Sequence, residues 1–325
     1  MKEGAVETHT GAVEKPRRRS SLPNFFVRLV REKPLGVIGG IIVLFLLVVA
    51  IFADLLAPYG VNESDVWHRL EPPSAQHLLG TDNLGRDLLS RIIYGARISM
   101  YVGLGGSGLA AIVSTIIGLT SGFIGGKTDL VIQRFVDAWM CFPGLLLYLT
   151  LMAIIGQGLV PVLLVLGMTR GIGTSRVIRG AAISIKENVY VDAATAVGCS
   201  TRRIIMHHLL PNVMAPIITI FAVGCGYMII DEASLSFLGF GIPPPAPSWG
   251  GMLSGSGRQY MYISPWLALW PGLALAIAVY GLNMFGDAVR DLLDPRLRGG
   301  LGRYGGVKAR KLKRISPEPM AITKQ

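Results

Sequence analysis

The 325-residue chain is 51% hydrophobic and only 16% charged, with a mean hydropathy of +0.51. Soluble domains carry about a quarter charged residues, so this composition argues against an ordinary soluble protein and indicates a lipid environment. The net charge of +11 is concentrated at the ends, with eight Lys and Arg in residues 1–34 and ten in residues 290–325. Because no soluble domain remains to fold around a nucleic acid, we interpret these ends as the cytoplasmic flanks of a membrane protein.

The first predicted elements are a polar tail (residues 1–22), a short interfacial helix (23–34) and a membrane span. From Gly36 to Leu56 the chain carries one charge, Asp54, close to its end. At about 1.5 Å per residue this segment is ~31 Å long, the thickness of one bilayer core. The polar, charge-balanced residues 58–97 then predict an extracytoplasmic loop.

Five further apolar segments predict an all-α, polytopic membrane protein with six transmembrane helices. The later spans are expected at residues 98–124, 130–155 (interrupted by Pro143), 159–172, 211–230 and 265–285. Six spans place both termini on one side, and the excess of Lys and Arg in the segments that share that side predicts an N-in, C-in orientation.

These spans divide the chain into four parts. They are an N-terminal tail with its interfacial helix (1–34), a first span with its loop (35–97), a core of spans two to six (98–290) and a basic cytoplasmic tail (291–325). The core contains one long inner segment, residues 173–211.

Two nucleotide-binding patterns occur in contexts that do not support them. Residues 103–108 match GxGxxG and residues 121–128 nearly match a P-loop, but each lies in or beside an apolar span with no preceding strand. Neighbouring residues on a helix face about 100° apart, so His207 and His208 do not form a metal site. We therefore expect no catalytic residue, metal or cofactor on this chain.

The segment 173–211 is too polar to cross the membrane and too patterned to be disordered. Residues 189–197 predict a helix, Gly198 a helix stop, and Ser200 or Thr201 the cap of a second helix. Pro211 is expected to open the fifth span. This pattern describes a helical elbow on the inner membrane surface, where it could contact a soluble partner; an ordinary amphipathic connector is the alternative.

The elbow resembles the EAA loop of ABC importer permeases. The matching positions are Asp192, Ala193, Ala194, Gly198, His208, Leu210 and Pro211. Asp192 replaces the usual Glu and His208 replaces the usual Ile, the second being common in the peptide branch of the family. The resemblance implies that these residues form a coupling helix that docks on an ATP-binding subunit.

Three more stretches resemble the dipeptide/oligopeptide/nickel branch of these permeases. They are residues 80–99, Phe142-Pro143 and residues 232–250. The resemblance implies a type I ABC importer permease fold in a prokaryotic plasma membrane and import of dipeptides or oligopeptides, with nickel and glutathione as open alternatives. It also implies a second homologous permease, two ATP-binding subunits that hold ATP and Mg, and an extracytoplasmic substrate-binding protein.

Residues of the pathway are harder to identify from sequence. Asp231 and Glu232 end the predicted fifth span near the outer interface, where solvation is easy, and they are candidates for gating or for binding a substrate ammonium. Tyr227 and Met228 are further candidates to face the pathway. We expect the loop 243–247 and Trp249 to form a rigid outer cap or an interfacial anchor. A stand-alone secondary transporter or channel is the alternative from another class.

Overall fold

The computed structural model describes residues 21–293, and most of these residues are helical. The described residues contain no strand beyond a single β-bridge between Thr81 and Asp87, so the prediction of an all-α chain is confirmed. Most of the two predicted tails, residues 1–20 and 294–325, lies outside the described residues.

Most of the helices are connected by short turns, several of them π-helical, and the two longer connections are residues 57–87 and 238–248. The α-helices are α1 Ser21–Glu32, α2 Pro34–Ile51, α3 Ala53–Leu56, α4 Leu88–Met100, α5 Ser107–Ile124, α6 Gly126–Met140, α7 Gly144–Ile155, α8 Leu159–Lys186, α9 Val189–Ala196, α10 Thr201–Ile204, α11 Leu210–Asn212, α12 Met214–Phe237, α13 Trp249–Met252, α14 Arg258–Tyr260 and α15 Trp266–Leu293. The π-helical turns are η2 Tyr101–Gly106, η3 Ile205–Leu209 and η4 Leu253–Gly257, and η1 Val66–His68 is a 3-10 turn.

Four helices of the described part are long and apolar enough to cross a membrane. They are α2, the continuous 37-residue run of α4, η2 and α5, then α12 and α15. The predicted second span, 98–124, is therefore only the later part of a longer helix. The amphipathic segment before it continues into the span without a break.

The predicted third and fourth spans differ from expectation. Residues 130–155 form two helices, α6 and α7, bent by 92° at the Pro143 interruption, and together they can make a fifth span. The predicted span 159–172 extends to Lys186 as α8. This helix is long enough to cross a membrane, but Arg170, Arg176 and Arg179 reduce its hydropathy. It is therefore not one of the four helices that are both long and apolar enough.

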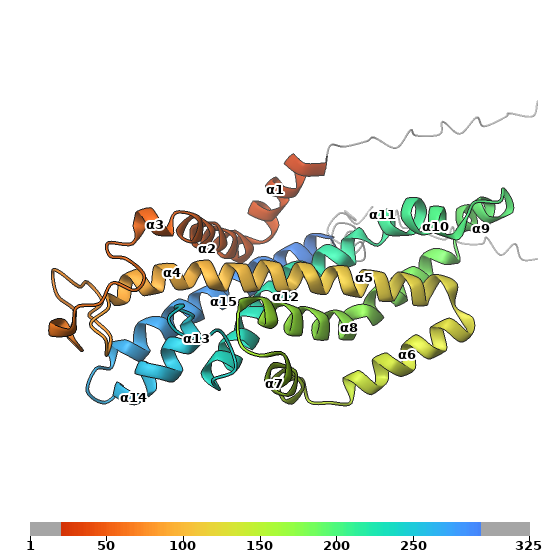
Figure 1. Cartoon of the computed structure of the whole chain (residues 1–325). Helices are drawn as coiled ribbons and strands as arrows, with labels where there is room; N and C mark the ends of the chain where they lie inside the picture. The colour runs from red at the N-terminus through yellow and green to blue at the C-terminus, as the bar shows by residue number, and fades with distance from the viewer. Residues whose placement is uncertain (1–20, 294–325) are drawn as a thin grey trace, which may run out of the picture.

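The functional candidates are arranged along the long α4–α5 helix, as Figure 1 shows. The short helices α9, α10 and α11 lie at one end of it, and the loop before α4 lies with α13 and α14 at the other. Helix α2 packs on α15 so closely that a methyl group on Gly39 would come within 2.6 Å of the Gly281 carbonyl oxygen. The candidate elbow is thus separated from the loop before α4 and from α13 and α14 by the length of the molecule.

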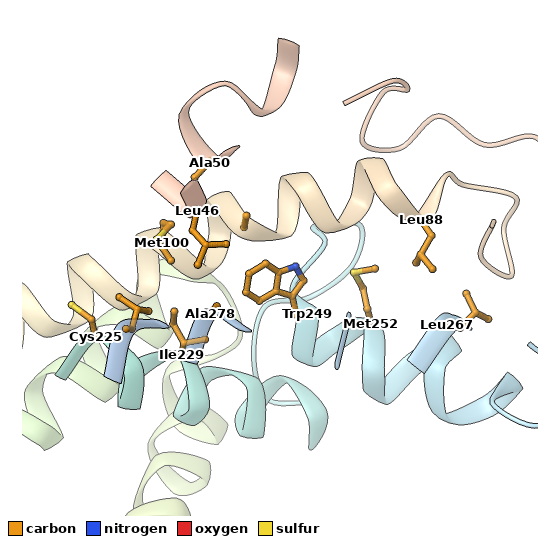
Figure 2. Close-up of a cluster of buried hydrophobic side chains, with 12 residues drawn as sticks. Leu46, Ala50, Leu88, Met100, Cys225, Ile229, Trp249, Met252, Leu267 and Ala278 are labelled. Carbon is orange, nitrogen blue, oxygen red and sulfur yellow. The ribbon is translucent and has the colours of Figure 1, made fainter. Parts of the chain in front are cut away.

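Trp249 occupies the largest of the hydrophobic cores, between α4 and α12 (Figure 2). Its side chain is 1% exposed, and its indole Nε1 donates a hydrogen bond to the Ile92 carbonyl oxygen at 3.1 Å. It packs directly on Gly95, where a Cβ would lie 2.6 Å from Nε1. Of the two expected roles of Trp249, that of an interfacial anchor is therefore wrong, because its indole is buried and fastens the loop before α13 to α4 from inside the protein.

Candidate functional site

The elbow begins with α9, which ends as the sequence predicts. Gly198 has a φ of +84°, the left-handed conformation that favours glycine. Its N–H donates to the Thr195 carbonyl at 2.9 Å, and the Cys199 N–H donates to the Ala194 carbonyl at 3.0 Å. These two bonds are the Schellman motif, which satisfies the last carbonyls of a helix and fixes the direction of the outgoing chain.

The second part of the elbow starts at Ser200. The Ser200 hydroxyl accepts a hydrogen bond from the Arg203 N–H at 3.4 Å, so Ser200 rather than Thr201 is the cap of α10. The chain continues through η3 and α11, and Val213 interrupts the helix before α12 begins at Met214. Pro211 therefore belongs to the elbow, and the predicted start of the fifth span at residue 211 is three residues too early.

A buried cluster attaches the elbow to the membrane helices. Val191 of α9, Ile204 of α10 and Leu209 of η3 are at most 2% exposed, and they pack in one core with residues of α5 and α8. On the α5 side, a Cβ at Gly118 would lie 2.6 Å from the Cβ of Ile178 in α8. A displacement of α9 would therefore be transmitted to α5 and α8 as a packed unit.

The opposite face of the elbow is open and apolar. Val189 and Val197 are 82% and 85% exposed, and Ala193 and Asp192 are exposed beside them, whereas Ala194 is half-buried. Apolar side chains exposed at both ends of an eight-residue helix are suited to contact with another protein. The small side chain of Ala193 leaves room for a partner to approach the backbone.

The remaining members of the predicted motif support α9 from behind. The His208 ring lies 6.2 Å from the ring of Tyr190 in α9, and the Asn212 amide donates to the His208 carbonyl at 2.6 Å. Leu210 is half-buried against the same core as Leu209, and Pro211 is exposed. The structure thus brings all seven motif positions together in one elbow.

Sequence reasoning missed the ionic bracing between α6 and α8. Arg179 donates to both oxygens of Asp129, with Nε–Oδ1 at 2.7 Å, and the Ser121 hydroxyl also donates to Asp129. Lys186 donates to the Phe123 carbonyl at 2.7 Å. Asp129 and Arg179 are 50 residues apart in sequence, so no local pattern pairs them.

The segment that resembles a P-loop lies next to these ionic contacts. Residues 121–128 form the end of α5 and a two-glycine turn into α6, with Gly125 at a φ of +69° and Gly126 at +57°. No strand precedes this turn, and Lys127 is exposed. The segment is therefore a connection between helices.

The four pathway candidates fall into different environments. Met228 is fully buried in the core between α7, α8 and α12, so it does not face a pathway in this chain. Glu232 is 1% exposed, which corrects the expectation of easy solvation. It accepts a hydrogen bond from the Ser236 hydroxyl at 2.6 Å, and this serine also accepts from the Ile242 N–H, so Glu232 fastens the loop between α12 and α13.

Tyr227 and Asp231 remain at accessible positions. Tyr227 is 46% exposed, and the guanidinium carbon of Arg170 lies 4.4 Å from the centre of its ring. Asp231, one turn further along α12, is half-buried and accepts a hydrogen bond from the Tyr148 hydroxyl at 3.3 Å. A cation, two tyrosines and a carboxylate therefore meet between α7, α8 and α12, a grouping that sequence reasoning identified only in part.

Comparisons with known proteins assign this architecture to a family. Residues 114–299 match the binding-protein-dependent transport system inner membrane component family, and residues 26–73 match the N-terminal TM domain of oligopeptide transport permease C. Among solved structures, a chain of the MetNI methionine ABC transporter in an inward-facing form matches with a TM-score of 0.50 and 17% identity. That match covers 63% of this chain and 96% of the other, and it shows the type I importer permease fold.

Curated relatives agree with the family match. The dipeptide transport system permease protein DppC of Alkalihalophilus pseudofirmus is 40% identical over 83% of this chain and 88% of its own length. The glutathione transport system permease protein GsiD of Pectobacterium atrosepticum is 37% identical (86% and 93%), and the oligopeptide transport system permease protein OppC of Bacillus subtilis is 35% identical (82% and 88%). The chain therefore belongs to the binding-protein-dependent ABC importers as a multi-pass inner-membrane permease subunit of the dipeptide/oligopeptide family.

Proposed function

We propose that this subunit imports dipeptides or oligopeptides as half of a permease heterodimer. Two ATP-binding subunits would bind ATP and Mg and hydrolyse the nucleotide, and an extracytoplasmic binding protein would deliver the peptide. The observation that carries the coupling role is the elbow, whose exposed apolar helix α9 is joined rigidly to α5 and α8 through one buried cluster. The peptide substrate is supported by the names of the relatives.

The proposal includes a topology of six spans with both termini in the cytoplasm. Four spans are the long apolar helices, and the other two are α8 and the bent α6–α7 pair. In this topology α9 is cytoplasmic and the loop before α4 is extracytoplasmic. The test is maleimide labelling of intact cells in a Cys141→Ser background, because Cys141 is exposed. Cysteine at Leu78 should react from outside, and cysteine at Val197 should react only after permeabilisation. The reverse pattern would refute the orientation.

The coupling role is tested by bulky substitution on the elbow. Ala193→Trp adds a large side chain to the exposed face without entering the buried cluster, unlike the half-buried Ala194. The complex should be purified in mild detergent, with copurified ATPase chains and ATPase activity measured together. We expect Ala193→Trp to release or uncouple the ATPase subunits while the second permease still copurifies.

The matched control is Leu78→Trp, at a 62% exposed position in the loop before α4. It should leave assembly and ATPase activity unchanged. If the wild-type chain purifies alone and still transports, the chain is a stand-alone transporter and the coupling role is wrong.

Glutathione is a second candidate substrate, because relatives named as glutathione permeases are 37% identical to this chain. Competition distinguishes the two substrates. Uptake of a labelled dipeptide should be inhibited by unlabelled di- and tripeptides more strongly than by glutathione if peptides in general are the substrate. The opposite order would identify a glutathione importer.

A further inference from the structure

One feature that the coupling role leaves unexplained is a groove of about 560 Å³ between α8, α12 and the end of α15. Arg170 and Thr174 line it from α8, Thr219 and Val223 from α12, and Arg290 from α15. Its volume lies in the range of small-molecule sites, and its walls combine apolar side chains with a few polar groups. Two arginines give the groove a positive character, which is suited to an anion.

Arg170 differs from the other arginines of α8. At about 1.5 Å per residue it lies ~17 Å from the beginning and ~24 Å from the end of the helix, near the middle of its length. Arg176 and Arg179 are paired with Asp137 and Asp129, but Arg170 forms no ion pair with any residue of the described part of the chain. Its Nε is buried and has no hydrogen-bond partner there.

A cation at this depth is costly without a counter-ion, so its retention indicates a partner that the folded chain does not supply. The Tyr227 ring, 4.4 Å from the guanidinium carbon, stabilises the positive charge and holds the guanidinium in place. The Arg170 guanidinium thus lies beside the groove in a fixed orientation and has no carboxylate acceptor from the described part of the chain.

Asp231 supplies the opposite charge one turn beyond Tyr227. Its carboxylate interacts electrostatically with Arg170, but the two groups are not joined as an ion pair among residues 21–293. The Tyr148 hydroxyl binds Asp231 Oδ2 at 3.3 Å and draws it toward α7. Asp231 does not line the groove, so the groove side of Arg170 has no carboxylate partner from the described part of the chain.

The length of the groove also fits a short peptide. Its α12 wall runs from Ala215 to Val223, which spans ~12 Å at 1.5 Å per residue. An extended dipeptide reaches about 7 Å and a tripeptide about 10 Å. A peptide with its carboxylate at Arg170 would therefore fit within the groove.

We propose that Arg170 binds the C-terminal carboxylate of the peptide during its passage through this subunit, with the guanidinium oriented by Tyr227. The proposal rests on the peptide-import function above and adds a substrate-binding residue to it. Guanidinium–carboxylate recognition uses two parallel hydrogen bonds, which a C-terminal amide cannot reproduce.

The test is direct binding to the purified complex of both permeases and both ATPases, in nanodiscs of neutral lipid and without the binding protein. The probes are dialanine and trialanine and their C-terminal amides, measured by isothermal titration calorimetry. Wild type should bind the free acids at least about tenfold more tightly than the amides. Arg170→Gln should remove this preference, and Arg170→Lys, which keeps the charge but not the paired donors, should retain part of it.

The matched control is Arg176→Gln, the same substitution two turns along α8 at an arginine that contacts Asp137 outside the groove. It should bind all four probes as wild type does. Copurification of the second permease with each variant verifies that the complex is assembled.

Several outcomes would overturn the proposal. The first is a wild-type complex that binds neither acid, and the second is a preference for the acids that persists in Arg170→Gln. The third is loss of the second permease from the Arg170 variants, which would assign the arginine to the subunit interface. If added short-chain phosphatidylglycerol binds to the wild-type complex and neither peptide acid does, the groove is a lipid site. If wild type imports peptides while Arg170→Gln behaves normally, only this inference fails; if wild type neither assembles nor imports peptides, the proposed function itself fails.

Discussion

Replacement of Gly198 by alanine tests whether a single backbone conformation holds the elbow. At a φ of +84° an L-residue other than glycine is strained by about 1–2 kcal/mol. An added methyl group would meet no atom of the surrounding protein within 4 Å, so the cost comes from the local backbone conformation and not from contact with other parts of the chain. The strain acts on the two hydrogen bonds that end α9, those of the Gly198 and Cys199 N–H groups.

The expected result is local opening of the elbow without global unfolding. A cost of 1–2 kcal/mol changes an opening equilibrium by about 5- to 30-fold, so hydrogen exchange of the Gly198 and Cys199 amides should accelerate by that factor in Gly198→Ala. Gly198→Asn should accelerate it less, because asparagine tolerates the left-handed conformation. Hydrogen–deuterium exchange with mass spectrometry on the purified complex measures both.

The matched control is the same substitution at Gly180, inside α8 and six residues before its end. A methyl group there also meets nothing within 4 Å, but Gly180 is helical, so alanine should stabilise by about 0.5–1 kcal/mol. Exchange in Gly198→Ala that matches wild type within error, or stabilisation at both glycines, would refute the argument from backbone conformation.

Three further predictions concern other parts of the chain. A double-mutant cycle with Asp129→Asn and Arg179→Gln should give a coupling free energy of about 1 kcal/mol, because both side chains are partly exposed and solvent screens the pair. Glu232→Ala should lower the melting temperature of the purified complex through a loss of about 1–3 kcal/mol, since it removes the acceptor to which the buried Ser236 hydroxyl donates, whereas Glu232→Gln should be close to wild type. In the loop before α4, the hydrogen bond to Asp65 raises the pKa of His68, so protonated His68 should protect the chain against trypsin cleavage after Arg69 below pH ~6.5, with protection lost as pH rises through the raised pKa.

The contrary results are equally defined. If the destabilisation in the double mutant equals the sum of the destabilisations in the two single mutants, Asp129 and Arg179 do not couple α6 to α8. Equal melting temperatures for Glu232→Ala and Glu232→Gln would show that the carboxyl group does not fasten the outer loop. For His68→Gln, the cleavage rate relative to wild type should exceed one at pH 6 and approach one well above the raised pKa; a ratio independent of pH would exclude a role for the imidazolium.

The sequence by itself determined the features whose causes are local. The apolar lengths of α2, α12 and α15 mark them as membrane helices, since a span needs only about twenty uninterrupted apolar residues. The elbow was predicted almost residue by residue, because a glycine stop and a serine cap act through hydrogen bonds to neighbours within four positions. The bend at Pro143 has the same local origin.

Only the tertiary structure decided which side chains of the spans are buried and which are available. Helix α12 is apolar on all sides, so no period in its sequence separates buried Met228 and Glu232 from accessible Tyr227 and Asp231. The neighbours of Arg170 come from α7 and α12, and their distance in the chain hides their proximity. Contacts of this kind depend on how helices pack, and packing is fixed by the whole set of helices together.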